Sequence, residues 1–291
     1  MIPHSRPTLG IKERRAVDRV LRGGQLAQGP QVAAFEAEAA RWLGLKGAVA
    51  VSSGTTALEL ALRGLGVGPG DEVLIPSYVC SSLWHAVRRA GAAPVLIDCD
   101  GRTLNPSMID AARKKTRKTR AIILPHLFGA ACDVEAAQAL GVPIVEDCAQ
   151  ALGARWNGKP LGGFGAVCVL SFYATKLLTT GEGGMVLSAD AALLKRVRRL
   201  RQYDEAAPDE VCGNAKMTDL QAALGREQLK RLPQFIAQRR RLAVAYDEAL
   251  RGLGVGLPEP TEGRVYYRYV IQLPGGRLGA VMERLQRAGV A

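Results

Sequence analysis

The chain has 291 residues, of which 48% are hydrophobic and 23% are charged, and its formal net charge is +12. A chain of this length and composition buries a large core in one or two domains, which excludes a disordered protein. No apolar run reaches the roughly 18 residues that cross a bilayer, and the N-terminus shows no apolar segment of a secretion signal. We therefore expect a cytoplasmic protein without a membrane partner.

Helical patterns fill most of the first 45 residues, and strands and helices alternate after them. Apolar residues recur at steps of three and four in residues 10–23 and 30–45. A β-type run follows at 47–51, then a turn and a helix that begins at Thr55. Further strands are predicted at 71–78, 94–99, 120–128, 142–147 and 166–173, with helices at 81–91, 106–115 and 133–141. Apolar strands between amphipathic helices predict an α/β fold, a three-layer αβα arrangement with a mainly parallel sheet.

The character of the chain changes after Gly184. Long basic helical patterns occupy 189–203 and 218–254, a linker rich in proline and glycine follows, and a strand at 266–273 precedes a last helix at 276–289. We predict a large domain over residues 1–240, including the N-terminal helices. Residues 241–291 are expected to be the start of a smaller α+β domain that the chain does not complete.

The positive charge gathers in three separated segments, 113–120, 195–201 and 239–241. Nucleic acid is one partner that such a charge could bind, but no aromatic residues for base stacking lie between the basic ones. Solvated helix faces are the favoured interpretation, although a small phosphorylated substrate could use the same field. The six cysteines are scattered singly, which predicts reduced thiols and no metal site.

A first group of chemically interesting residues stands at 53–56, where a strand turns into a helix. Free backbone N–H groups, the helix dipole and the hydroxyl groups of Thr55 and Thr56 could hold a phosphate there. For this segment taken alone, an ordinary helix cap is the favoured interpretation. The spacing of glycines fits neither a dinucleotide site nor a P-loop.

Two further groups follow the strands at 142–147 and 166–173. Asp147 ends an apolar strand, where a carboxylate requires a positive partner, such as a protonated pyridine nitrogen; a metal or a helix cap are the alternatives. Lys176 follows the other strand, where desolvation would favour the neutral amine that forms Schiff bases, and a structural lysine is the alternative. A phosphate nest, an acid and a lysine at strand ends of one sheet together match the needs of pyridoxal 5'-phosphate (PLP).

Ordered blocks across nearly the whole chain carry a resemblance. They read FEAEAARWLG, AVAVSSGTTALELAL, GVGPGDEVLIPSY, GAAPVLIDCD, AIILPHLFG, VEDCAQALGA and LSFYATKLLTTGEGGM. Through them the chain resembles the DegT/DnrJ/EryC1/StrS family of PLP-dependent sugar aminotransferases. Members of that family have the fold type I architecture of aspartate aminotransferase.

The resemblance implies a role for individual residues. Lys176 would carry PLP as a Schiff base and move the proton, Asp147 would pair with the pyridinium nitrogen, and Gln150 would lie against the ring. The residues implied to hold the phosphate are Gly54, Thr55, Ser171 and Asn214, the last supplied by the neighbouring subunit. A homodimer with a shared active site follows from the resemblance.

The resemblance also implies the reaction. An amino acid, usually L-glutamate, would donate its amino group through the cofactor to a ketone carbon of a nucleotide-linked sugar. Lys176 favours transamination over the reaction of the related dehydratases, in which histidine replaces the lysine. A dehydratase or lyase, and a shortened family member that binds without catalysis, stay as alternatives.

Several positions depart from the family pattern. Cys80 stands nearest the place of the aromatic residue that stacks on PLP, so Tyr78 could take that role. Lys216 replaces an arginine, which weakens a bidentate grip on an anion. His126, at another strand end, could line the site or be a structural imidazole. The chain ends at Ala291, whereas family members continue further.

Overall fold

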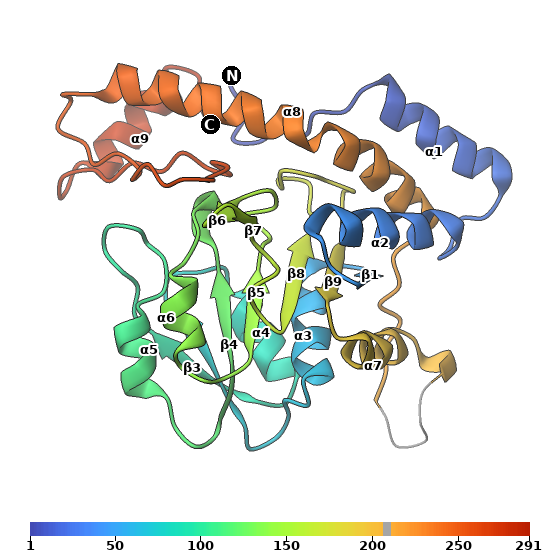
Figure 1. Ribbon diagram of the computed structural model, residues 1–291. Coiled ribbons are helices and arrows are strands. Elements are labelled where there is room, and N and C mark those ends of the chain that lie inside the picture. Colours follow the sequence, from blue (N-terminus) through green and yellow to red (C-terminus); the bar gives the residue numbers. More distant parts are fainter. Residues whose placement is uncertain (206–210) are drawn as a thin grey trace.

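A computed structural model of the chain describes residues 1–205 and 211–291 (Figure 1). The strands are β1 Gly47–Val51, β2 Glu72–Pro76, β3 Ala93–Ile97, β4 Thr119–Pro125, β5 Ile144–Asp147, β6 Arg155–Trp156, β7 Lys159–Pro160, β8 Val167–Ser171 and β9 Gly184–Ser188. The α-helices are α1 Ile11–Gly23, α2 Pro30–Leu43, α3 Gly54–Gly64, α4 Ser82–Arg89, α5 Met108–Lys114, α6 Val134–Gln138, α7 Ala191–Arg201, α8 Asp219–Leu250 and α9 Leu278–Arg287. Two 3-10 turns lie at Leu127–Gly129 and Tyr203–Glu205.

Seven strands form one sheet in the order β1-β9-β8-β5-β4-β2-β3. Neighbouring strands from β3 through β2, β4 and β5 to β8 pair in parallel, whereas β9 pairs antiparallel with both β1 and β8. The predicted three-layer arrangement with a mainly parallel sheet is therefore confirmed. β9 was missed because its five residues follow a glycine-rich loop without a helix between β8 and β9 that would mark a βαβ unit.

Both faces of the sheet are buried, and successive strand residues face opposite layers. In β8, Cys168 and Leu170 pack into a cluster with Phe35 of α2, whereas Val167 and Val169 pack with Leu58 of α3. Because both side-chain sets are apolar, the strand shows a continuous apolar run rather than an alternating pattern. Helices on both faces thus fix the strand ends rigidly in space.

The predicted strand at 266–273 is wrong. These residues form a single bridge, Gly256 with Gln272, and no strand. A strand needs a neighbouring ladder to satisfy its backbone groups, and the backbone oxygens of Tyr266 and Tyr267 instead accept hydrogen bonds from Arg239 of α8. The last helix is confirmed as α9. The proposed boundary at residue 240 falls inside α8 and stays a prediction.

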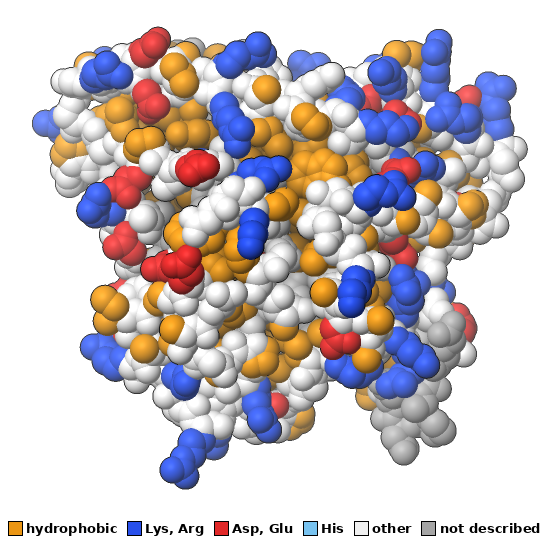
Figure 2. Space-filling model, viewed as in Figure 1, with side chains coloured by type: hydrophobic (Ala, Val, Ile, Leu, Met, Phe, Trp, Pro, Cys, Tyr) orange, Lys and Arg blue, Asp and Glu red, His pale blue; other side chains and the backbone are white. Residues whose placement is uncertain are grey.

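The surface charge is dispersed. Figure 2 shows basic side chains spread over the visible face, from the region of α8 to those of α5 and α7, rather than gathered in one stripe. No helix in the described part of the chain is long and apolar enough to cross a membrane.

A carboxylate from α8 caps the start of α2. Gly29, the cap residue of α2, has no side chain to satisfy the first N–H groups of that helix. Asp219, only 1% exposed, accepts hydrogen bonds from the N–H groups of Gly29 at 2.9 Å, Gln31 at 3.1 Å and Val32 at 2.9 Å. This contact joins two segments that are distant in sequence.

Replacing Asp219 is therefore expected to destabilise the whole chain. Asp219→Ala leaves three N–H groups without their acceptor, and we expect a loss of about 2–3 kcal/mol in the free energy of unfolding. Urea denaturation measures this loss. Asp18→Ala is the control, since Asp18 makes an exposed ion pair with Arg22. An equal effect of the two substitutions would contradict the capping role.

Candidate cofactor and active site

The loops that follow β1, β5 and β8 leave the sheet at the same edge. β5 and β8 are neighbours, and β9 alone separates β8 from β1. Because these three strands run in one direction, the residues after each lie together below α8, at the top of Figure 1. This edge contains the predicted residues Gly54, Asp147 and Lys176.

The first turn of α3 lies tightly against the end of β8. A Cβ atom on Gly54 would stand 2.7 Å from the Cβ atom of Ser171, so only glycine permits this approach. The Ser53 hydroxyl accepts the N–H group of Thr56 at 3.1 Å. The N–H groups of Gly54 and Thr55 have no acceptor within their own helix, as at any helix start. The structure thus packs the start of α3 against Ser171 and leaves the N–H groups of Gly54 and Thr55 suited to an anion.

Asp147 ends β5 and is 7% exposed. Its Oδ1 atom accepts one hydrogen bond, from the N–H group of Ala149 at 3.0 Å. Burial raises the pKa of this carboxyl above its ordinary value, although that hydrogen bond and the positive charge of Lys176 act in the opposite direction. A buried acid with one donor is suited to a ligand that brings a positive charge or a proton.

Lys176 lies in the loop after β8 and is partly buried. Its Nζ atom stands 5.1 Å from the ring centre of Tyr267, and the Tyr267 hydroxyl is 3.1 Å from Oγ1 of Thr175. Tyr267, 6% exposed, therefore covers the lysine with an aromatic face. Sequence reasoning missed Tyr267, because it belongs to a segment predicted as a strand and reaches Lys176 only through the tertiary fold.

Gln150 is anchored rather than free. Its Oε1 atom accepts the N–H group of Phe128 at 2.9 Å, and Phe128 has a left-handed backbone with φ of 54°. In the described part of the chain, the amide nitrogen of Gln150 makes no hydrogen bond. The ring of Phe128 in turn lies 6.5 Å from that of Tyr78, although Tyr78 and Cys80 are both exposed. Of the two candidates for a stacking residue, the structure packs Tyr78 toward this loop.

Asn214 does not join the other predicted residues within this chain. It is exposed, and we find no hydrogen bond of its side chain in the part of the chain that the structure describes. Its neighbour Ala215 accepts a hydrogen bond from the N–H group of Ser52 at 2.8 Å. Asn214 thus lies near the start of the α3 turn but points its polar group to the surface.

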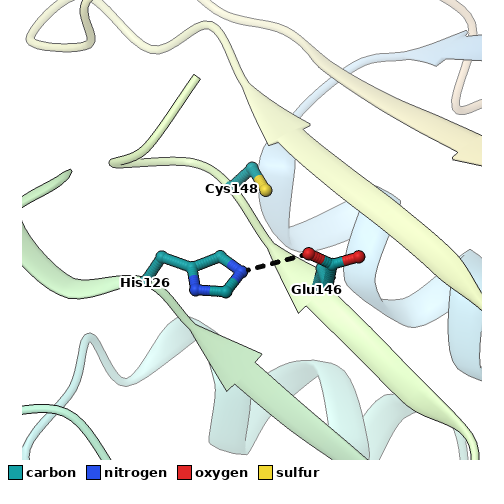
Figure 3. Close-up of side chains that lie close together, drawn as sticks. All are labelled: His126, Glu146 and Cys148. Atoms are coloured by element: carbon teal, nitrogen blue, oxygen red, sulfur yellow. Dashed lines mark hydrogen bonds and ion pairs between the residues drawn. The ribbon is translucent and has the colours of Figure 1, made fainter. Parts of the chain in front are cut away.

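His126, Glu146 and Cys148 form a buried cluster beside Asp147 (Figure 3), with ligand atoms within 4.8 Å of one another. Nδ1 of His126 accepts the N–H group of Cys132 at 3.1 Å, so the proton of the neutral ring is on Nε2, which donates to Glu146 at 3.3 Å. His126 is 0% exposed. These contacts support a structural imidazole.

Glu146 is fully partnered. Besides His126, it accepts the N–H groups of Gly162 at 2.8 Å, Phe164 at 2.7 Å and Gly165 at 2.6 Å. Burial acts to raise its pKa, but these hydrogen bonds outweigh burial and hold the pKa below its ordinary value. A hydrogen bond with Cys168, together with burial, raises the pKa of the Cys148 thiol. A saturated carboxylate and a protonated thiol suit a structural network better than a metal site.

Comparison with known proteins places this geometry in a family. The family model described as the DegT/DnrJ/EryC1/StrS aminotransferase family matches residues 7–291. The GDP-perosamine synthase of Vibrio cholerae is 36% identical over 273 residues, which cover 90% of this chain and 74% of that protein. The dTDP-3-amino-3,4,6-trideoxy-alpha-D-glucose transaminase of Streptomyces venezuelae is 40% identical over 270 residues, 88% of this chain and 71% of that protein.

Solved structures of aminotransferases are also similar to this chain. The aminotransferase TlmJ from Streptoalloteichus hindustanus superposes with a TM-score of 0.94 at 36% identity, covering 99% of this chain and 83% of that one. DesV of S. venezuelae, solved in complex with a ketimine intermediate, superposes with a TM-score of 0.91 at 36% identity, covering 96% and 78%. The chain therefore belongs to the DegT/DnrJ/EryC1/StrS family of PLP-dependent sugar aminotransferases, and it has their fold type I architecture.

Proposed function

We propose that this aminotransferase moves the amino group of an amino acid, L-glutamate in the first place, to a keto sugar linked to a nucleotide. The observation that carries the proposal is that Lys176, Asp147 and the start of α3 lie at one edge of the sheet. Gly54, at the start of α3, packs against Ser171 there. The named relatives that act on GDP- and dTDP-linked sugars support the substrate class. A cytoplasmic location stays a prediction.

The residues present fit PLP. The N–H groups of Gly54 and Thr55, beside the Ser171 hydroxyl that approaches Gly54, would hold the phosphate. Asp147, buried and with one donor, would accept a hydrogen bond from the protonated ring nitrogen. When bound, PLP supplies an aldehyde for an amine and a ring that withdraws electrons.

The protein's own groups would perform the remaining tasks. Lys176 would hold the cofactor through its Nζ atom and, once free, take up or give a proton at that atom. Asp147 would keep the proton on the ring nitrogen, and Gln150, held by Phe128, would offer its amide N–H groups. Tyr267 and α8 would exclude water from one side of the lysine.

The site is proposed to be shared between two copies of the chain. Asn214 is exposed beside the turn that begins α3. Where two copies meet at this surface, the Asn214 side chain of one copy could reach the phosphate site of the other. A homodimer would then be the active form.

Lys176→Ala is expected to abolish covalent attachment of PLP. Borohydride reduction of the wild-type protein with PLP should add the mass of the reduced cofactor to the peptide that contains Lys176. In a separate sample that is not reduced, L-glutamate should convert the bound cofactor to its amine form and release 2-oxoglutarate. Lys159→Ala, an exposed lysine on β7, is the control. Attachment without this half-reaction would contradict transamination and favour a non-catalytic family member.

Asp147→Asn is expected to separate stability from catalysis. The raised pKa of Asp147 means that the folded protein loses stability as pH rises from the ordinary aspartate value of 3.8 to the raised value. The cofactor-free variant should therefore gain unfolding free energy over the wild type across that window and keep the gain above it. The half-reaction with L-glutamate should slow by about tenfold or more, since the proton on the ring nitrogen is lost. A variant that is less stable than the wild type at pH 7 would argue against the desolvated carboxylate.

A shared site predicts complementation between two inactive variants. Lys176→Ala lacks the amine, and Asn214→Asp places a negative charge beside the phosphate. Mixed dimers of the two contain one site with both native residues, so up to about a quarter of wild-type activity should return if subunits assort at random and sites act independently. Activity that stays absent in mixtures shown to contain heterodimers would contradict the shared site.

A further inference from the structure

The basic segment 239–241 is not the uniform solvated face that its sequence predicted. Arg241 is exposed, but Arg240 donates to the backbone oxygens of Gly263 and Arg264. Arg239 is partly buried and lines a cavity of about 220 Å³ together with Lys176. Of these three arginines, Arg239 therefore lines the same cavity as Lys176.

The charge in this cavity has one sign. Its walls are the loop after β8, α8 and the N-terminal residues 5–8, and its charged side chains are Arg6, Lys176 and Arg239. The lining contains no acidic residue; its other polar groups are hydroxyls and amides. A second cavity of about 690 Å³ adjoins it, shares Arg6 and Arg239, adds Arg268, and is also lined without an acidic residue.

Arg239 is held in place by neutral acceptors. Its Nη1 atom donates to the backbone oxygens of Tyr266 at 3.3 Å and Tyr267 at 2.8 Å, and no carboxylate pairs with it in the described part of the chain. Burial lowers its pKa, yet a guanidinium keeps its proton in proteins. A partly buried cation without a counter-charge is unfavourable until an anion arrives.

We propose that Arg239 and Arg6 form an anion-binding subsite beside Lys176, which takes an oxyanion group of a substrate. The inference rests on the proposed function, because its use depends on Lys176 as the reacting amine. Two sources share this chemistry: the diphosphate of a nucleotide-linked sugar and a carboxylate of the amino-acid donor. The fork of a guanidinium binds either group through two hydrogen bonds.

The test uses the PLP-loaded protein, in which the cofactor occupies its own phosphate site, and inorganic pyrophosphate as the probe. Calorimetric titration should show pyrophosphate binding that weakens with added salt. If the subsite takes the diphosphate, Arg239→Gln should weaken the affinity for pyrophosphate by about tenfold. Arg6→Gln should weaken it by about threefold, because Arg6 is exposed. Arg239→Lys should recover part of the loss. Arg241→Gln, two residues further along α8 and exposed, is the matched control and should bind as the wild type does.

A second titration, with L-glutamate, separates the sources. The concentration dependence of the first half-reaction should be unchanged in Arg6→Gln if the subsite takes the diphosphate, and shifted by a similar factor if it takes the carboxylate. Unchanged behaviour toward both ligands in Arg239→Gln and Arg6→Gln would overturn the proposal. If Arg239→Gln fails to fold, Arg6→Gln alone decides, because Arg6 is exposed and makes no hydrogen bond or ion pair within the described chain.

The borohydride experiment and the titrations distinguish a failure of the proposed function from a failure of the subsite. If borohydride does not trap PLP on Lys176 in the wild-type protein, the cofactor assignment is wrong, whatever pyrophosphate does. If PLP is trapped and neither arginine changes either titration, only the subsite is wrong. Binding of pyrophosphate to the loaded protein needs no turnover, so a slow second half-reaction does not obscure the result.

Discussion

The close packing of the α3 turn on the end of β8 is the constraint on which this site depends. Gly54 has no room for a side chain against Ser171, and a Cβ atom on Gly184 of β9 would stand 2.3 Å from the backbone oxygen of Ser53. These approaches fix the helix start beside the strand that leads to Lys176. The N–H groups proposed to hold the phosphate, and the loop that carries Lys176, are then placed by rigid backbone rather than by flexible side chains.

Two neighbouring carboxylates on β5 show how strand geometry assigns opposite tasks. Glu146 points to one side of the sheet, where three backbone N–H groups and His126 saturate it and hold its pKa low. Asp147 points to the other side, where it has one donor and a raised pKa. The first carboxylate fixes the loop at 162–165, and the second is left available to a ligand. Side chains of successive strand residues face opposite ways, so adjacent acids need not share a role.

The long helix α8 joins the parts that surround the lysine. Its first residue caps α2 through Asp219, and Arg239 and Arg240 hold the backbone at 263–267 that places Tyr267 over Lys176. Gly129 permits the same segment to approach the loop after β4, since a Cβ atom there would stand 2.9 Å from the nitrogen of Tyr266. One helix thus supports the fold and brings positive charge to the cavity.

The sequence by itself determined the alternation of strands and helices, the parallel sheet, and the places of Gly54, Asp147 and Lys176 at strand ends, because these depend on local periodicity and on where short apolar runs stop. Tertiary structure alone decided that residues 266–273 form no strand, that Tyr267 covers Lys176, and that Arg239 faces a cavity while Arg241 faces solvent. These outcomes depend on contacts between segments far apart in the chain. Local composition carries no record of such contacts, since a basic helical turn has the same pattern whether one of its side chains meets water or a buried wall.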